Sequence, residues 1–461
     1  MNLEPKSNTI VFFNIFSLLY ISSFLFHISK TGEQILWPAC LIIFITVNIF
    51  SRSSVKKLVF ILFLISSSLF QAYHFPQIAN HSTLQLFINI FLLTKIFYKR
   101  NEPCENVIFQ QKNILCYFLV WVYFIAGFHK LNIDFFNPDV SCANWYLNKL
   151  GHILGFTKTT PFGFTEVNLP VLIKNINPYF VVASEILGAA LLLTYRKIGL
   201  FIFIIMHSFL AFGGFADFSA IAFSILICFL PMDLLKSFYK VNGHIKFAVF
   251  SVLTSVLAIL FNYDFILRSM ETHNFKFILG VGFMLSISPI FPIFYKGLPS
   301  LSKVNFTKLN LSKINIIFII TLVVFSINPY LGLSTAGTFS MFSNIKTENG
   351  LNNHYIMPNS QAFDYQKYNV EVISYEPDYL INRFSNEYMY PYKLFKSLLR
   401  DYLEEPDKHY NIKFKVNGKI MSLNEKTLPN SHWVKYNSWL ERYYLNFRSF
   451  NKSPTPNTCK W

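Results

Sequence analysis

The sequence predicts an all-α polytopic membrane protein with a small C-terminal extracytoplasmic α+β domain. Three observations support this class: 53% of the 461 residues are hydrophobic, 18% are aromatic, and long apolar segments recur along most of the chain. The 53 phenylalanines do not fit a water-soluble core. The formal net charge of +16 would suggest nucleic acid for a soluble protein. In membrane proteins, however, Lys and Arg gather in cytoplasmic loops, so we expect a lipid bilayer and no nucleic acid as partner.

Apolar segments that are long enough, or nearly long enough, to span a bilayer predict about eleven transmembrane helices. They cover residues 10–27, 35–50, 57–74, 82–98, 114–131, 178–195, 197–213, 216–232, 246–264, 275–295 and 314–331. Some are short, and Pro38, Pro289 and Pro292 can break their helices, so the count stays open by one or two. No small-residue cleavage site follows the first segment, which we interpret as a retained anchor.

The distribution of basic residues predicts the orientation of these spans. If they alternate from an inner N-terminus, the inner loops hold most Lys and Arg residues of this region, including Arg52, Lys57 and Lys99. Apart from Lys130, the outer loops hold few, such as Lys149 and Lys174. Positive charge favours the cytoplasmic side, so we predict a multi-pass protein with a cytoplasmic N-terminus and an extracytoplasmic C-terminal domain.

A change in composition predicts a membrane domain at residues 1–333 and a separate α+β domain at residues 334–461. We expect a strand at 370–374, a helix at 391–404, a hairpin at 411–423 that turns at Asn417 and Gly418, a closing helix at 433–447 and a frayed end at 451–460.

The six cysteines are scattered, without CxxC or Cys/His spacing, so we expect no metal site. In the predicted topology only Cys142 and Cys459 face the outside. We therefore hypothesise that they form a disulfide that ties the tail to the loop after Lys130; the alternative is two free thiols.

The stretch from Tyr123 to Phe136 carries His129 and Lys130 where an apolar helix ends. A lysine at a helix end can simply extend its ammonium group to the membrane interface. The alternative is a catalytic base, because burial in apolar surroundings favours the neutral lysine.

Further ionisable groups lie in or beside the predicted spans. Asn80 and His81 begin the fourth span, and this pair is also a plain helix start. His207 lies among apolar residues, where a packing role is the alternative to catalysis. Glu185 is expected to pair with His207 or Lys130, because an unpaired carboxylate at membrane depth is costly. The predicted topology opens Lys130, His81 and His207 toward the same outer face, which favours a shared site.

Three segments resemble one enzyme family. Ala126-Gly127-Phe128-His129-Lys130-Leu131-Asn132-Ile133-Asp134 resembles the Ala-Gly-x-x-Lys-Leu-x-x-Asp segment of the vitamin K-dependent gamma-carboxylases and their bacterial relatives, the horizontally transferred transmembrane domain family. Asn80-His81-Ser82-Thr83-Leu84 is similar to the family's Asn-His-Ser-Tyr-Leu stretch, and Met206-His207-Ser208 to its later membrane histidine segment. The resemblance covers roughly residues 60–232.

The resemblance implies a carbon–carbon lyase that couples the oxidation of reduced vitamin K, or a menaquinone-type naphthohydroquinone, to the carboxylation of a protein glutamate, with O2 and CO2 as co-substrates. Lys130 matches the family's base, His81 an assisting histidine and His207 a histidine near the quinone. The catalytic candidates are thus Lys130, His81 and His129, and the quinone-binding candidates are His207, Asn80 and Glu185. Two alternatives stay open: a quinone-dependent oxidoreductase without carboxylation, and a non-catalytic membrane scaffold or maturation factor.

Overall fold

The computed structural model of the protein describes residues 4–31, 36–76, 78–153, 158–159, 165–166, 170–262, 272–289, 291, 312–348, 351–358, 361–376, 384–403, 409, 411–435, 438–452 and 455–459.

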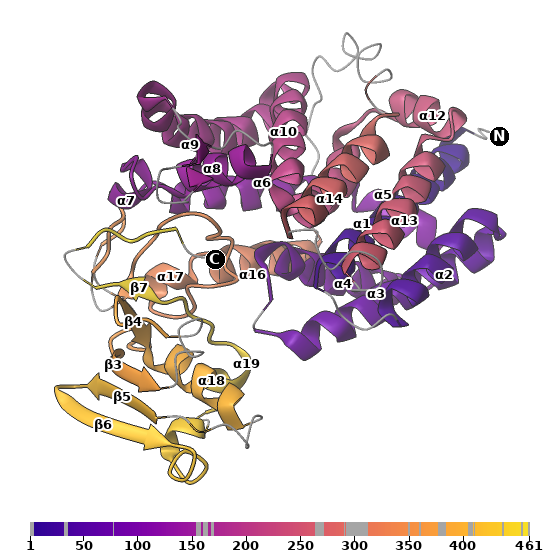
Figure 1. Ribbon diagram of the computed structural model, residues 1–461. Coiled ribbons are helices and arrows are strands. Elements are labelled where there is room, and N and C mark those ends of the chain that lie inside the picture. The colour runs from indigo at the N-terminus through magenta and orange to yellow at the C-terminus, as the bar shows by residue number, and fades with distance from the viewer. Residues whose placement is uncertain are drawn as a thin grey trace.

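Helices form the part of the molecule that precedes the C-terminal sheet (Figure 1). Their bounds are α1 (Glu4–Thr31), α2 (Leu36–Phe50), α3 (Ser53–His74), α4 (Asn80–Tyr98), α5 (Cys104–Gln110), α6 (Lys112–His129), α7 (Ile133–Phe136), α8 (Cys142–Ile153), α9 (Val171–Thr194), α10 (Arg196–Leu210), α11 (Ala216–Leu226), α12 (Met232–Lys240), α13 (Gly243–Asn262), α14 (Thr272–Ile287), α16 (Lys313–Ser326) and α17 (Asn328–Leu331). A π-turn, η1 (Ala211–Phe215), joins α10 to α11, and a 3-10 turn, η2 (Ile227–Phe229), follows α11. A two-stranded ribbon of β1 (Lys158–Thr159) and β2 (Thr165–Glu166) lies between α8 and α9.

Among the described residues, five helical segments are long and apolar enough to cross a membrane. They are Ser7–His27, Ser53–His74, Lys112–His129, Val171–Thr194 and the continuous run Arg196–Phe229. Shorter apolar helices cover Trp37–Phe50, Gly243–Leu257, Ile278–Ile287 and Lys313–Ser326. The mainly helical class and the membrane-length helices are therefore confirmed. The predicted spans at 246–264 and 275–295 extend beyond the described residues.

Helix α1 forms the centre of the helical part. It packs against α2, α5, α11, α12 and α13. Phe12, Phe16 and Phe24 are fully buried, and Phe16 meets the ring of Phe60 in α3 edge-on at 6.2 Å. A helix that is apolar around its whole circumference belongs in an interior, which explains this central position.

The C-terminal part contains a five-stranded antiparallel sheet in the order β6-β5-β3-β4-β7. The strands are β3 (Asn369–Glu376), β4 (Tyr388–Pro391), β5 (Asn411–Val416), β6 (Lys419–Asn424) and β7 (Phe450–Asn451). Helix α18 (Tyr392–Leu403) contributes Phe395 and Leu399 to a core that includes Phe414 and Trp433. Asn417 and Gly418 both have positive φ between the paired Val416 and Lys419, as a tight hairpin requires. The predicted α+β tail, its first strand, its helix and its hairpin are confirmed.

The prediction of a closing helix at 433–447 is wrong. The chain forms a 3-10 turn, η6 (His432–Val434), and the short helix α19 (Trp439–Tyr443), which begins where the side chain of Ser438 accepts a hydrogen bond from the amide of Glu441. After α19 the chain runs without helix into β7, and Leu445 and Phe447 pack with Leu333. Burial of these two side chains against the end of the helical part overrides their local helical spacing.

The prediction of a frayed end at 451–460 is also wrong for the described residues. Asn451 and Asn457 are buried, and Cys459 is bonded to Cys142. The polar composition of this segment suggested fraying, but its side chains hydrogen-bond to the rest of the protein.

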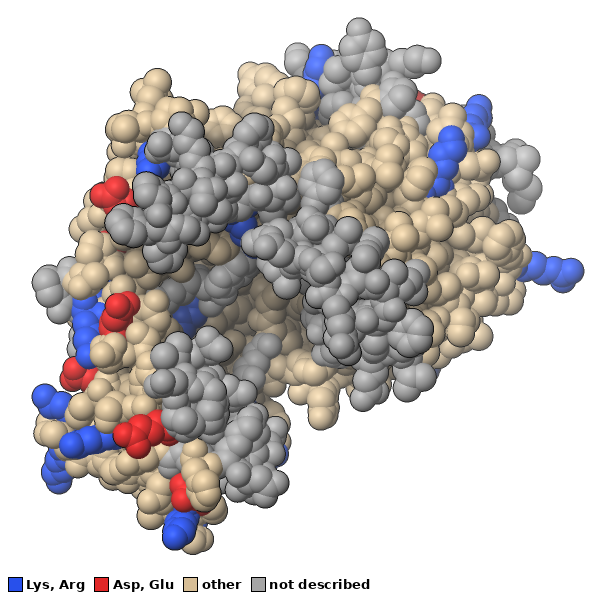
Figure 2. Space-filling view, in the orientation of Figure 1, with Lys and Arg blue, Asp and Glu red and all other residues tan. Residues whose placement is uncertain are grey.

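Charge is distributed unevenly over the surface. In the view of Figure 2, Lys, Arg, Asp and Glu gather over the C-terminal sheet region, whereas the described surface of the helices is largely uncharged. This difference is compatible with helices in a membrane and a tail in water. The exact domain boundary at 333/334 stays a prediction.

Candidate functional site

A cavity of about 360 Å³ lies between helices α4, α6, α8, α9, α10 and α11 and the segment after α17. Its volume falls within the ~300–1,000 Å³ of typical small-molecule sites. Most lining side chains are apolar. The polar ones are Asn80, His81, Tyr123, Lys130, Tyr146, Asn177, Ser184 and Glu185. Of the residues predicted from the sequence, Asn80, His81, Lys130 and Glu185 therefore share this cavity.

Lys130 and Glu185 form a buried ion pair in the cavity wall. The Nζ atom of Lys130 donates to both carboxylate oxygens of Glu185, at 2.8 and 3.0 Å, and to the carbonyl oxygen of Ala126 at 3.2 Å. The two side chains are only 4% and 13% exposed. Of the two partners considered for Glu185, the structure therefore gives Lys130. The pair therefore places one positive and one negative side chain, joined by two hydrogen bonds, in the cavity wall.

Gly127 allows the two helices that carry this pair to approach. A Cβ atom at this position would lie 2.6 Å from Cγ1 of Ile186 and 3.1 Å from Cβ of Glu185. Any larger residue would push α9 away from α6. The glycine of the Ala-Gly-x-x-Lys segment therefore sets the distance over which Glu185 reaches Lys130.

His81 lines the cavity from the first turn of α4. Its Nε2 atom lies 3.3 Å from Oδ2 of Asp217 and 3.1 Å from Nδ1 of His27. Its Nδ1 atom, and Oδ1 of neighbouring Asn80, are buried without a hydrogen-bond partner among the described residues. A buried polar atom without a partner is costly, so both atoms are suited to contact a polar ligand atom.

His207 lies behind the cavity wall, next to Tyr123. Its Nε2 atom hydrogen-bonds to the hydroxyl of Tyr123, which does line the cavity, and its Nδ1 atom lies 3.3 Å from Oγ of Ser219. His207 can therefore influence a ligand through Tyr123. Tyr123 was part of the stretch that the sequence singled out, but it carried no signal of its own because its role depends on His207.

His129 does not lie in the cavity wall. It is buried on another side of α6, where Nδ1 contacts the hydroxyl of Tyr330 at 2.8 Å and Nε2 contacts the carbonyl oxygen of Ser326 at 3.1 Å. The structure therefore separates His129 from the adjacent Lys130. Its contacts connect α6 to α16 and α17.

An irregular stretch at residues 334–348, here called the outer segment, forms one wall of the cavity. It contributes Phe339, Met341 and Phe342 to the lining. The side chain of Asn132, two residues after Lys130, donates to the carbonyl oxygen of Ser343 at 2.5 Å. The outer segment is thus held directly over the end of α6.

Polar contacts from the tail extend this attachment. Asp134 accepts hydrogen bonds from Nδ2 of Asn353 at 2.7 Å and from the amide of Asn457 at 3.0 Å. His354 bonds through Nε2 to the carbonyl oxygen of Phe128 at 2.9 Å, and burial lowers the pKa of its imidazole. Asn132 and Asp134 of the sequence motif therefore serve to attach the tail.

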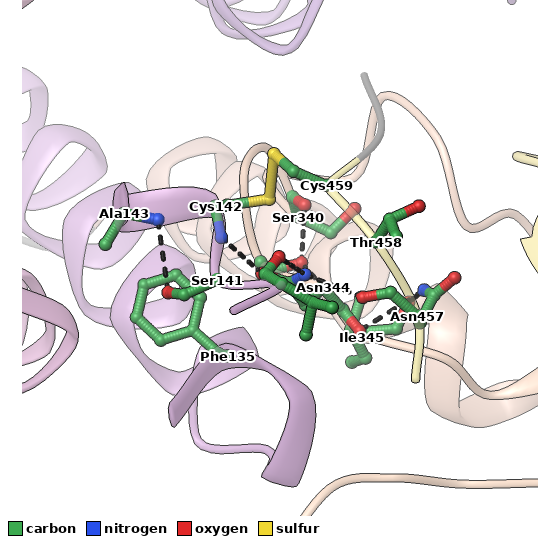
Figure 3. Close-up of a disulfide and its surroundings, with 12 residues drawn as sticks. Phe135, Ser141, Cys142, Ala143, Ser340, Asn344, Ile345, Asn457, Thr458 and Cys459 are labelled. Carbon is green, nitrogen blue, oxygen red and sulfur yellow. Dashed lines mark hydrogen bonds between the residues drawn. A yellow bond between two sulfur atoms is a disulfide. The ribbon is translucent and has the colours of Figure 1, made fainter. Parts of the chain in front are cut away.

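A disulfide between Cys142 and Cys459 joins the beginning of α8 to the end of the chain (Figure 3). Next to it, Oδ1 of Asn344 accepts from the amide of Cys142 at 2.7 Å, and Nδ2 of Asn344 donates to the carbonyl oxygen of Asn457 at 2.7 Å. The disulfide hypothesis is confirmed, and Asn344 of the outer segment hydrogen-bonds to the chain beside both ends of the bridge.

The cavity reaches the apolar surface between α9 and α10. Phe180, Phe201 and Phe209 line it and are 67%, 56% and 57% exposed. All three belong to membrane-length helical segments. An apolar ligand could therefore enter from the lipid, whereas the outer segment covers the other side.

Comparison with protein-family models, with curated proteins and with solved structures gave no significant match.

Proposed function

We propose that the protein is a membrane enzyme that binds a reduced naphthoquinone in this cavity and couples its oxidation to the carboxylation of a protein glutamate. The observation that carries the proposal is the buried Lys130–Glu185 pair in the wall of an apolar cavity that opens between membrane-length helices. A ring substrate dissolved in lipid needs such an entrance, and the removal of its hydroxyl proton needs a base shielded from water.

Lys130 is the base in this proposal, and Glu185 prepares it. As an ammonium group, Lys130 has no lone pair and cannot accept a proton. Lys130 therefore first passes a proton to Glu185 along their 2.8 Å hydrogen bond. The neutral amine then accepts a proton from a hydroxyl group in the cavity. Asn80 and His81 orient that hydroxyl, and His207 acts through Tyr123.

The coupling to carboxylation is supported by the sequence resemblance around Lys130, His81 and His207. When bound, the hydroquinone supplies, through its oxidation by O2, the strong base that removes a γ-proton from glutamate. The overall reaction consumes hydroquinone, O2, glutamate and CO2, and yields quinone epoxide, water and γ-carboxyglutamate. The proposal includes about eleven spans, a cytoplasmic N-terminus and an extracytoplasmic tail. In this topology the outer segment faces a glutamate-containing protein on the extracytoplasmic side.

The test uses the purified full-length protein in detergent, supplied with a reduced naphthoquinone, O2, labelled bicarbonate and a glutamate-rich peptide. We expect label in the peptide with the wild type and none with Lys130→Ala. Lys174→Ala is the matched control, because Lys174 does not line the cavity and its contact to Asn144 uses only its backbone carbonyl.

Each outcome separates the candidates. Quinone epoxide without label in the peptide would reduce the proposal to an oxidoreductase without carboxylation. Neither signal with several naphthoquinones would contradict an enzymatic role for the cavity and favour the scaffold.

A further inference from the structure

Three ionisable side chains from three different helices converge beside the cavity. His27 belongs to α1, His81 to α4 and Asp217 to the first turn of α11. One ligand atom from each lies within 4.8 Å of the other two. His81 and Asp217 are buried, and His27 is partly buried. Asp217 is brought here by the kink after α10, where Gly214 has φ of 90°.

We propose that His27, His81 and Asp217 bind a divalent transition-metal ion such as Zn²⁺ or Fe²⁺. The inference does not rest on the proposed function, because it uses neither the quinone nor Lys130. It departs from the expectation of no metal site, which considered only the spacing of the cysteines along the chain.

The spacing of the ligand atoms fits a coordination sphere. With metal–ligand bonds of about 2.0–2.2 Å, neighbouring ligand atoms lie roughly 3.0–3.5 Å apart. His27 Nδ1 and His81 Nε2 are 3.1 Å apart, and His81 Nε2 and Asp217 Oδ2 are 3.3 Å apart. Two imidazoles and one carboxylate are a ligand set that Fe²⁺ and Zn²⁺ use in proteins.

Neighbouring groups hold the outer atoms of two ligands. His27 Nε2 lies 3.3 Å from Oγ of Ser82, which leaves Nδ1 directed at His81. Oδ1 of Asp217 accepts from the amide of Phe218 at 2.9 Å, which leaves Oδ2 directed at His81. Metal-binding histidines and carboxylates are commonly oriented in this way by a second contact.

A hydrogen-bonded cluster satisfies these groups less well. His81 Nε2 faces both His27 Nδ1 and Asp217 Oδ2, and a ring nitrogen offers a single in-plane proton or lone pair for these two neighbours. A metal ion at this point would accept the lone pair of His81 Nε2 together with lone pairs of His27 Nδ1 and Asp217 Oδ2, so that one ion would satisfy all three atoms.

The experiment measures metal binding rather than activity. The full-length protein in detergent is treated with a chelator, desalted and titrated with Co²⁺, whose visible absorption reports coordination, and with Zn²⁺ against a chromophoric indicator. We expect one equivalent to bind the wild type. Ser82→Ala removes a group that only orients a ligand, and it should weaken metal binding by about 10-fold. Loss of such an orienting group typically costs roughly 10–100-fold in affinity. Asp217→Asn and His27→Gln change a ligand itself and should weaken binding by more than that.

The control is His244→Gln, which alters a buried histidine outside the cluster and should bind metal as the wild type does. Size-exclusion profiles establish that each variant is folded. Ser82→Ala keeps the test decisive if a ligand variant misfolds, because it leaves all three ligands in place. No stoichiometric binding by the wild type, or equal affinity in wild type, Asp217→Asn and Ser82→Ala, would overturn the proposal.

Discussion

At the scale of single residues, the Lys130–Glu185 pair places one positive and one negative side chain in a mostly apolar cavity wall. Both side chains are almost enclosed, and the carboxylate is the only acidic partner within 4.0 Å of Nζ among the described residues. Removing one member of a buried pair leaves an uncompensated charge, whereas replacing both by apolar groups is often neutral for stability. Comparing a variant of one member with a variant of both members can therefore distinguish a loss of stability from a loss of activity.

Glu185→Gln should lower the free energy of unfolding by roughly 3–5 kcal/mol and abolish quinol oxidation. The double variant Lys130→Met/Glu185→Leu should regain most of the stability and stay inactive. Thermal denaturation in detergent and the quinone assay measure the two effects. Glu102→Gln, at an exposed position, is the control. A double variant with wild-type activity would contradict the proposed base.

Lys393 predicts a pH dependence of stability in the tail. Burial, followed by the nearby Arg400, lowers the pKa of its ammonium group from 10.5 to about 8; Lys396 acts in the same direction and Glu441 opposes it. Between pH 8 and 10.5 the unfolded chain binds more protons at this residue than the folded one. The free energy of unfolding should therefore rise with pH in that window, by on the order of 3 kcal/mol, and the full destabilisation applies below pH 8.

Hydrogen exchange of strands β3 and β5 as a function of pH measures this effect. Lys393→Met should increase protection at pH 7 and remove most of the rise above pH 8, because the buried charge is absent. Lys435→Met, at an exposed lysine, should change neither. An unchanged pH profile in Lys393→Met would refute the assignment.

At the scale of elements, the contact between α6 and α9 is the one that builds the site. The Cβ atom introduced by Gly127→Ala would overlap Ile186, so we expect a loss of roughly 1–3 kcal/mol in stability and a displaced Glu185. Quinol oxidation should fall accordingly. Adding Ile186→Ala removes the overlapping Cγ1 atom and should restore activity in part. If Gly127→Ala alone keeps full activity, the close approach of the helices does not matter for the site.

At the scale of the whole molecule, the disulfide between Cys142 and Cys459 connects the tail to the cavity across a sequence separation of 317 residues. Cross-links that close long loops typically contribute about 2–4 kcal/mol. Cys142→Ala/Cys459→Ala should lower the denaturation temperature and make the outer segment more sensitive to protease. Cys40→Ala, which removes an exposed free thiol, is the control. Equal protease sensitivity of the outer segment in both variants would show that the bridge does not hold it.

The sequence by itself determined the mainly helical class with its membrane-length apolar helices and the α+β tail with its Asn417–Gly418 turn. It also named four polar residues of the cavity lining, Asn80, His81, Lys130 and Glu185. Composition and local periodicity suffice for these, because they reflect burial and backbone geometry within one segment. The disulfide was a hypothesis from the predicted topology, and the structure decided between it and two free thiols.

Only the tertiary structure decided which side chains meet. Glu185 reaches Lys130 across 55 residues, and His27 reaches His81 across 54. His129 turns away from Lys130 although the two are adjacent in sequence. These outcomes depend on how closely and at what rotation helices pack. Gly127, the kink at Gly214 and the central position of α1 set this packing. The pattern within one segment does not encode that rotation, because it arises only when the other helices cover its faces.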